Sequence, residues 1–218
     1  MKRKMIEWWK NSQLFAFVDR IISTYFRKKL TNKDFTILCP NCIGGVVYHR
    51  LGCRFLSPTI NMWLVAPDFV RFLLHLDAYL ALPLVFVDSV PCPVAVLGGG
   101  ELPEIRLNFN HAKSEDEARD AWERRKNRIR KDNLYIMMYM LDGVTEEEVH
   151  ALDDYPCQNK VIFTHRKDVG IDWAYYIEPN MRAKYPYNYL DKDFFGIRRF
   201  EKKFDFVAFL NQKREPRA

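Results

Sequence analysis

The chain has 218 residues, 48% of them hydrophobic, and a formal net charge of +6. This composition excludes a disordered chain and predicts one globular domain that can bury a sizeable core. The positive excess is modest and lies mostly in short runs near the two ends, so we expect no nucleic-acid partner; such runs form solvated faces or contact an anionic surface such as lipid headgroups.

Localisation can be predicted from the apolar segments and the cysteines. No stretch of about 18 apolar residues is present, which argues against a membrane span. The basic residues Lys2-Arg3-Lys4 are not followed by the apolar region of a signal peptide. The five cysteines form no zinc pattern beyond the single Cys-x-x-Cys of residues 39–42, so we expect free thiols in a reducing cytoplasm and no bound metal.

Residues 3–28 predict one or two amphipathic helices with basic residues between the apolar ones. A basic helix that carries tryptophans can lie on a membrane surface, or it can pack on the domain after it. The width of the apolar stripe favours packing. We therefore expect an N-terminal helical extension over 1–32, packed on an α/β domain over 33–218, with peripheral contact to the inner face of the membrane as the alternative.

The segment 35–51 predicts a strand, a turn and a helix, with a thiol in the turn. Phe35-Thr36-Ile37-Leu38 is typical of a short buried strand, and Val46 to Leu51 continues a helix. Between them lies Asn41-Cys42-Ile43-Gly44-Gly45. Paired glycines let a ligand approach the backbone, and a thiol at a helix N-terminus has its thiolate favoured by the dipole and by free N–H groups. The other interpretation is a small buried cysteine in a tight turn.

The remaining segments alternate between the two types of element. Helices are predicted over 68–80, 114–131, 145–153 and 203–211, and strands over 84–87, 94–97, 104–109, 134–138 and 160–164. Alternation of this kind indicates an α/β fold. We expect three layers, with a Rossmann-like parallel or mixed sheet covered by helices on both faces and the amphipathic N-terminal helices added to it.

Two histidines follow predicted strands, as the thiol does. His111 comes after the strand 104–109 and His165 after the strand 160–164. If these strands are parallel to 35–38, both histidines and Cys42 share one edge of the sheet, where ligands bind in open α/β folds. A Cys–His pair of this kind can act as nucleophile and base. Either histidine is otherwise a hydrogen-bonded loop residue.

The helix 114–131 places a charge on its inner face. At 100° per residue, Arg125 falls among Ala118, Ala121, Trp122 and Ile129, with Arg128 to one side. A buried arginine requires a carboxylate, carbonyl groups or a ligand anion. Arg125 and Arg128 therefore either grip a phosphate or carboxylate, or form a structural ion pair.

Taken together, these motifs resemble a bacterial family that is commonly labelled as exopolysaccharide biosynthesis, domain-of-unknown-function family 1919. The resemblance covers about residues 33–211 and rests on five segments: 35–45, 57–59 (Ser-Pro-Thr), 109–111 (Phe-Asn-His), 121–129 and 133–134. In that family the thiol segment more often looks like Asn-Asn-Cys-Trp-Gly-Gly, so Pro40 and Ile43 depart from it. The resemblance implies a role in capsule or exopolysaccharide synthesis.

The residues and the resemblance together favour a cytoplasmic transferase that moves an acyl or related group to a saccharide or an activated saccharide precursor. Cys42 would be the nucleophile and His111, or His165, the base. The substrate would be held by Asn41, Gly44, Gly45, Ser57, Thr59, Arg125, Arg128 and His165. The donor would be a coenzyme A thioester or a nucleotide sugar. The alternatives are a glycosyltransferase that uses a nucleotide sugar and a non-catalytic scaffold of a polysaccharide assembly complex.

Overall fold

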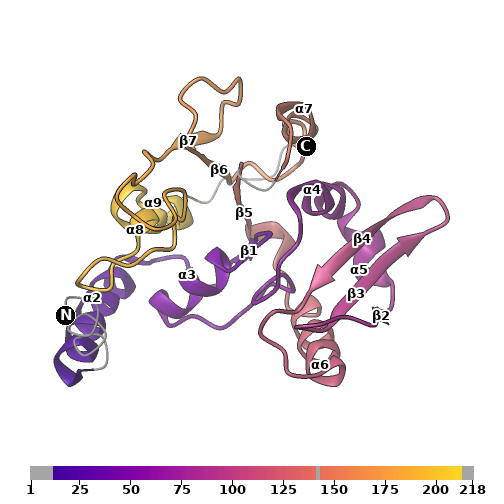
Figure 1. Ribbon diagram of the computed structural model, residues 1–218, viewed down its shortest axis with the longest axis horizontal. Helices are drawn as coiled ribbons and strands as arrows, with labels where there is room; N and C mark the ends of the chain where they lie inside the picture. The colour runs from indigo at the N-terminus through magenta and orange to yellow at the C-terminus, as the bar shows by residue number, and fades with distance from the viewer. Residues whose placement is uncertain (1–11, 141–142, 213–218) are drawn as a thin grey trace.

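A computed structural model describes residues 12–140 and 143–212 of the chain, and its centre is a parallel sheet (Figure 1). The strand order is β1 (Thr36–Leu38), β5 (Leu134–Tyr139), β6 (Lys160–Thr164) and β7 (Ala174–Tyr176), with every neighbouring pair parallel. β1 and β5 are buried along their whole length, as expected for parallel strands covered on both faces. The first three strands confirm the predicted ones. β7 was not predicted, because it is mostly exposed and lacks the buried apolar run that marks β1.

Side chains of the parallel sheet alternate between two hydrophobic cores. One core takes Ile37, Tyr135 and Val161, and it is closed by α3 (Ile43–Leu51), α8 (Arg199–Lys203) and α9 (Phe206–Asn211). The other core takes Leu38, Ile136 and Ile162, and it is closed by α4 (Ala66–Leu74), α5 (Leu76–Ala81), α6 (Glu115–Lys126) and α7 (Glu146–His150). The sheet therefore lies between two layers (Figure 1), which confirms the predicted three-layer α/β fold.

A second, antiparallel sheet carries the strands that we expected in the main sheet. Its order is β2 (Val85–Val87), β3 (Val94–Gly99) and β4 (Leu102–Asn108). β3 and β4 form a hairpin whose turn needs glycine, because Gly99 and Gly100 have φ values of 116° and 66°. The expectation that the strand before His111 lies in the parallel sheet is therefore wrong. Alternation of apolar and polar residues indicates that a segment is a strand, but it does not show which sheet the strand joins.

Several helices end earlier than their periodicity suggests. The predicted helix 68–80 is broken at His75, whose φ of −123° lies outside the helical range, and so gives α4 and α5. α6 ends at Lys126, five residues early. The predicted helix 203–211 corresponds to α9, which begins three residues later, and α8, which lies before it, was not predicted. The capping box of Thr145 and Glu148 is confirmed at α7. No described helix is both long and apolar enough to cross a membrane.

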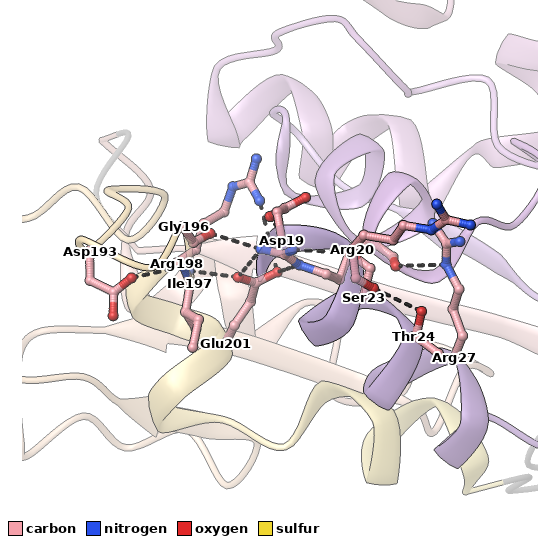
Figure 2. A network of polar contacts seen from close by, with 11 residues as sticks. Asp19, Arg20, Ser23, Thr24, Arg27, Asp193, Gly196, Ile197, Arg198 and Glu201 are labelled. Atoms are coloured by element: carbon pink, nitrogen blue, oxygen red, sulfur yellow. Dashed lines mark hydrogen bonds and ion pairs between the residues drawn. The ribbon is translucent and has the colours of Figure 1, made fainter. Parts of the chain in front are cut away.

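The N-terminal helix α2 (Gln13–Lys29) is tied to the core by a buried arginine of α3. Every N–H of the Arg50 guanidinium has an acceptor: Asp19, Ser23, the carbonyl of Gly196 and both oxygens of Glu201, at 2.6–3.1 Å. Figure 2 shows how α2 turns Asp19 and Ser23 toward the C-terminal segment that supplies Gly196 and Glu201. These bonds hold α2 against the core; the part of the predicted extension before Ser12 lies outside the described residues.

Candidate functional site

The turn between β1 and α3 leaves the Cys42 thiol outside the hydrogen bonds of the helix. The Asn41 side chain accepts the first free N–H, that of Ile43, at 3.0 Å. Cys42 stands at the N-cap position with helical dihedrals, and its own side chain makes no capping bond. The thiol is half-buried.

His111 reaches this thiol from the antiparallel sheet. The segment 60–64 connects the two, because the N–H of Leu64 donates to the carbonyl of Pro40 at 2.8 Å and Trp63 exchanges backbone bonds with Asn108 at 2.8 and 2.9 Å. The turn after Asn108 then brings His111 Nε2 to 3.5 Å from Cys42 Sγ. The structure thus joins two side chains that are 69 residues apart, although by a different route from the one expected.

The acidity of Cys42 differs from the expectation. Burial raises the pKa of the Cys42 thiol, whereas we expected the helix N-terminus to lower it. The physical reason is desolvation: the thiol is half-buried, and its side chain makes no capping bond to an N–H of α3 that would stabilise a thiolate. Burial also raises the pKa of Cys39 to about 12 and that of Cys157 to about 11. Cys42 therefore needs a base to become a nucleophile near neutral pH, and His111 is in position to be that base.

Gly44 and Gly45 allow α3 to pack closely on the segment below it. A Cβ on Gly44 would lie 2.6 Å from Cys39 Sγ, and one on Gly45 would lie 2.8 Å from Asn61 Oδ1. Both glycines are buried. Close packing therefore explains why these two positions are glycine. Anion binding by their backbone amides stays a prediction.

Ser57 and Thr59 lie beneath the Cys42 turn instead of in a cleft. Both are fully buried. Their hydroxyls are 3.1 Å apart, and Thr59 Oγ1 accepts the N–H of Cys39 at 3.1 Å. These bonds support the turn from below, so the two hydroxyls position the backbone near Cys42 and have no exposed surface for a substrate.

Arg125 belongs to a group of four arginines with Arg54, Arg124 and Arg128, which we call the arginine cluster. Arg125 Nη1 donates to the carbonyl of Ile60 at 2.7 Å, and its Cζ lies 5.6 Å from the centre of the Phe55 ring. Burial, then Arg124 and Arg128, lower the pKa of Arg125, and burial, then Arg54 and Arg124, lower that of Arg128. Within the described part of the chain, no carboxylate pairs with any of the four. Sequence reasoning missed Arg54 and Arg124, whose charge matters only because the fold gathers them.

We expect Arg125→Met to preserve most of the free energy of unfolding and to weaken anion binding. The change leaves no buried carboxylate without a partner, so its cost should be about 1 kcal/mol, the scale of one hydrogen bond. Binding of pyrophosphate should weaken by roughly 1.5–3 kcal/mol, the scale of a charged hydrogen bond. Denaturant melts and calorimetry measure the two effects.

Arg119→Met is the matched control. Arg119 lies on the same helix, donates to the carbonyl of Leu84 at 3.2 Å and stands 4.9 Å from the centre of the Phe86 ring, but it is not in the arginine cluster. It should change stability similarly and leave pyrophosphate binding intact. A loss of about 3 kcal/mol or more of stability in Arg125→Met alone would assign that residue a structural role instead.

His165 stands where the sequence predicted, at the carboxyl end of β6, two strands from β1. Its ring packs on Tyr187 with centres 4.5 Å apart, and its Nδ1 is buried without a hydrogen-bond partner among the described residues. The contact with Cys42 is made by His111, not by His165. Over residues 12–140 and 143–212, no three His, Cys, Asp or Glu side chains are grouped to hold a metal ion.

Comparison of the sequence with known proteins identifies its family. Residues 14–211 match the domain family described as "Domain of unknown function (DUF1919)", and the match begins inside α2. An uncharacterized protein of Haemophilus influenzae is 36% identical over 202 residues, which cover 92% of this chain and 94% of the relative. The chain therefore belongs to the DUF1919 family.

Proposed function

We propose that the protein is a transferase that moves an acyl group from an activated donor to a saccharide precursor through Cys42 and His111. The observation that carries the proposal is the 3.5 Å contact between Cys42 Sγ and His111 Nε2. A thiol and an imidazole in contact form the pair that covalent acyl transfer requires. The thiol is half-buried and the imidazole exposed, so a substrate can reach them. A closed apolar site would have favoured the scaffold alternative.

The reaction balances with these two groups alone. His111 takes the Sγ–H proton while sulfur attacks the carbonyl carbon of a thioester donor, and the donor's C–S bond breaks as its thiol leaves with that proton. The acyl group is then on Cys42. A saccharide hydroxyl attacks the acyl carbon, His111 takes the hydroxyl proton, and the Cys42 thiol is restored as the ester departs.

The arginine cluster supports a donor that carries phosphate. Four guanidinium groups without carboxylate partners among the described residues form a site of positive potential. Arg125 is bonded to Ile60, whose side chain would lie 3.0 Å from a Cβ on Gly44. The cluster is thus linked through one residue to the first turn of α3. Coenzyme A thioesters and nucleotide sugars both carry a diphosphate that such a site can hold.

Incubation with coenzyme A thioesters and mass spectrometry tests the proposal. We expect one acyl group to appear on the peptide that contains Cys42, and none in the Cys42→Ala variant. Cys92→Ala is the matched control, because Cys92 is also half-buried and bonds to Asn110, next to His111. Equal labelling of Cys42→Ala would refute a nucleophilic Cys42. Thermal stabilisation by nucleotide sugars, without acylation by any thioester, would favour the glycosyltransferase alternative.

An exposed apolar stripe on α2 favours a precursor that is held at a membrane. Leu14, Phe17, Ile21 and Tyr25 share one side of the helix and are each more than half exposed. The helix has one acidic residue, Asp19, and it is ion-paired with Arg50 at 2.6 Å. The charge that remains on α2 comes from four basic residues, Arg20, Arg27, Lys28 and Lys29. An apolar stripe with basic neighbours fits the surface of an anionic bilayer.

We expect the protein to float with vesicles that contain phosphatidylserine and not with vesicles of phosphatidylcholine alone. Phe17→Glu should abolish flotation, because it places a carboxylate in the centre of the stripe. Val85→Glu is the control, since Val85 is equally exposed but lies on β2. Unchanged flotation of Phe17→Glu would contradict the membrane contact. A dimer that Phe17→Glu dissociates without lipid would assign the stripe to a second copy.

A further inference from the structure

A cavity lies at the opposite end of the parallel strands from Cys42. Its volume is about 600 Å³, and it is lined by residues 73–78, 131, 132, 134, 151 and 154–159. These are the α4–α5 junction and the segments that lead into β5 and β6, which begin at Leu134 and Lys160. The cavity has the size of a small-molecule site. It shares no residue with the Cys42–His111 pair, so a ligand bound here is independent of the proposed function.

A buried amide in the lining lacks a partner for its oxygen. Asn159 is only 5% exposed, and its Nδ2 donates to the carbonyl of Leu134 at 3.3 Å. Its Oδ1 has no hydrogen-bond partner in the described part of the chain. The orientation of the amide is fixed, because exchanging the two atoms would place Oδ1 against the Leu134 carbonyl. An amide oxygen that is buried and unpaired calls for a donor. A ligand N–H would supply one when the lining side chains around Asn159 move aside, because this oxygen is out of contact with solvent in the structure.

The cavity wall is apolar and its rim is acidic. Leu73, Leu76 and Leu134 are buried and Tyr155 half-buried, so they offer an apolar surface to a ring. The rim carries the carboxylates of Asp77, Asp132 and Asp154 and one ammonium, that of Lys131, which is already paired with Asp77. An acidic rim attracts cations and repels phosphates and carboxylates.

We propose that this cavity binds a cationic heteroaromatic amine. The ring N–H would donate to Asn159 Oδ1, the ring would pack on the apolar wall, and the ammonium group would meet the rim carboxylates. A carboxylate or phosphate in place of the ammonium group would be excluded. The site is thus opposite in charge preference to the arginine cluster.

Three probes with one ring system test the proposal by calorimetry on the full chain. Tryptamine should bind. 1-Methyltryptamine, which lacks the ring N–H, should bind about tenfold more weakly, the factor that corresponds to one hydrogen bond. Indole-3-propionate, which carries a carboxylate in place of the amine, should not bind. Failure of tryptamine to bind, or equal affinity for all three probes, would overturn the proposal.

Two exposed alanines of α5 supply the matched variants. Ala78 lines the cavity and Ala81 does not, so Ala78→Phe should abolish tryptamine binding while Ala81→Phe retains it. Asn159→Ala should remove the discrimination between tryptamine and 1-methyltryptamine. Tryptamine binding that persists in Ala78→Phe would place the ligand elsewhere. Discrimination that persists in Asn159→Ala would refute the assigned hydrogen bond.

Discussion

Replacing Arg50 with methionine is expected to lower the free energy of unfolding by about 3–5 kcal/mol. The side chain of Arg50 is 2% exposed and that of Glu201 fully buried, so the change leaves a carboxylate in the interior without its main partner. The attraction between α2, α3 and α8 is lost at the same position. Urea denaturation followed by circular dichroism measures the effect.

Two further variants separate this cause from a simple loss of charge. Arg166→Met breaks a surface pair with Glu146 in which the two side chains are 56% and 35% exposed, and it should cost about 1 kcal/mol or less. Adding Glu201→Leu to Arg50→Met removes the stranded carboxylate and should recover most of the lost stability. A double variant that is no more stable than Arg50→Met would show that the buried charge is not the cause.

Replacing His111 with glutamine is expected to slow acylation of Cys42 by a small activated thioester roughly 10²–10⁴-fold near neutral pH. Burial raises the pKa of the Cys42 thiol, so the thiol is protonated there and must lose its proton to a base. As the pH rises through that pKa, the thiolate forms without help. The rates of the wild type and the variant should therefore converge at high pH.

The control for this experiment is His75→Gln, because His75 is exposed at the α4–α5 break and makes no contact with Cys42. Its pH profile should match that of the wild type. Profiles of His111→Gln and the wild type that run parallel at all pH values would show that His111 does not act as the base. Equal rates near neutral pH would show the same.

The elements that could be predicted from the sequence are those that depend on the pattern of neighbouring residues. The strand before Cys42 and the helix after it arise from a buried apolar run and a turn, and the histidine was recognised because it comes after a strand. The separate sheet of β2–β4 could not be predicted, since alternation is the same in either sheet. The Arg50 network was missed because its partners, at positions 19 and 201, are distant in sequence.

The acidity of the thiol could not be predicted for a different reason. A helix N-terminus offers few free N–H groups, and which acceptor takes each one depends on side-chain geometry. Cys42 stands at the N-cap of α3 but makes no capping bond, and burial of its side chain raises the pKa of the thiol. The sequence places the thiol at the helix N-terminus, but only the three-dimensional structure shows how far its side chain is buried.

The bridge through residues 60–64 makes the distance between sulfur and imidazole a property of the whole molecule. Cys42 comes after a strand of the parallel sheet and His111 after a strand of the antiparallel one, and in the described part of the chain no ladder joins the two sheets. They are joined near the pair by the bonds of Leu64 to Pro40 and of Trp63 to Asn108. A displacement of one sheet against the other by about an ångström would take the base out of reach of the thiol. In the proposed mechanism, activation of the nucleophile therefore depends on tertiary alignment, and a substitution at Trp63 or Leu64 would act on the chemistry without touching a reacting atom.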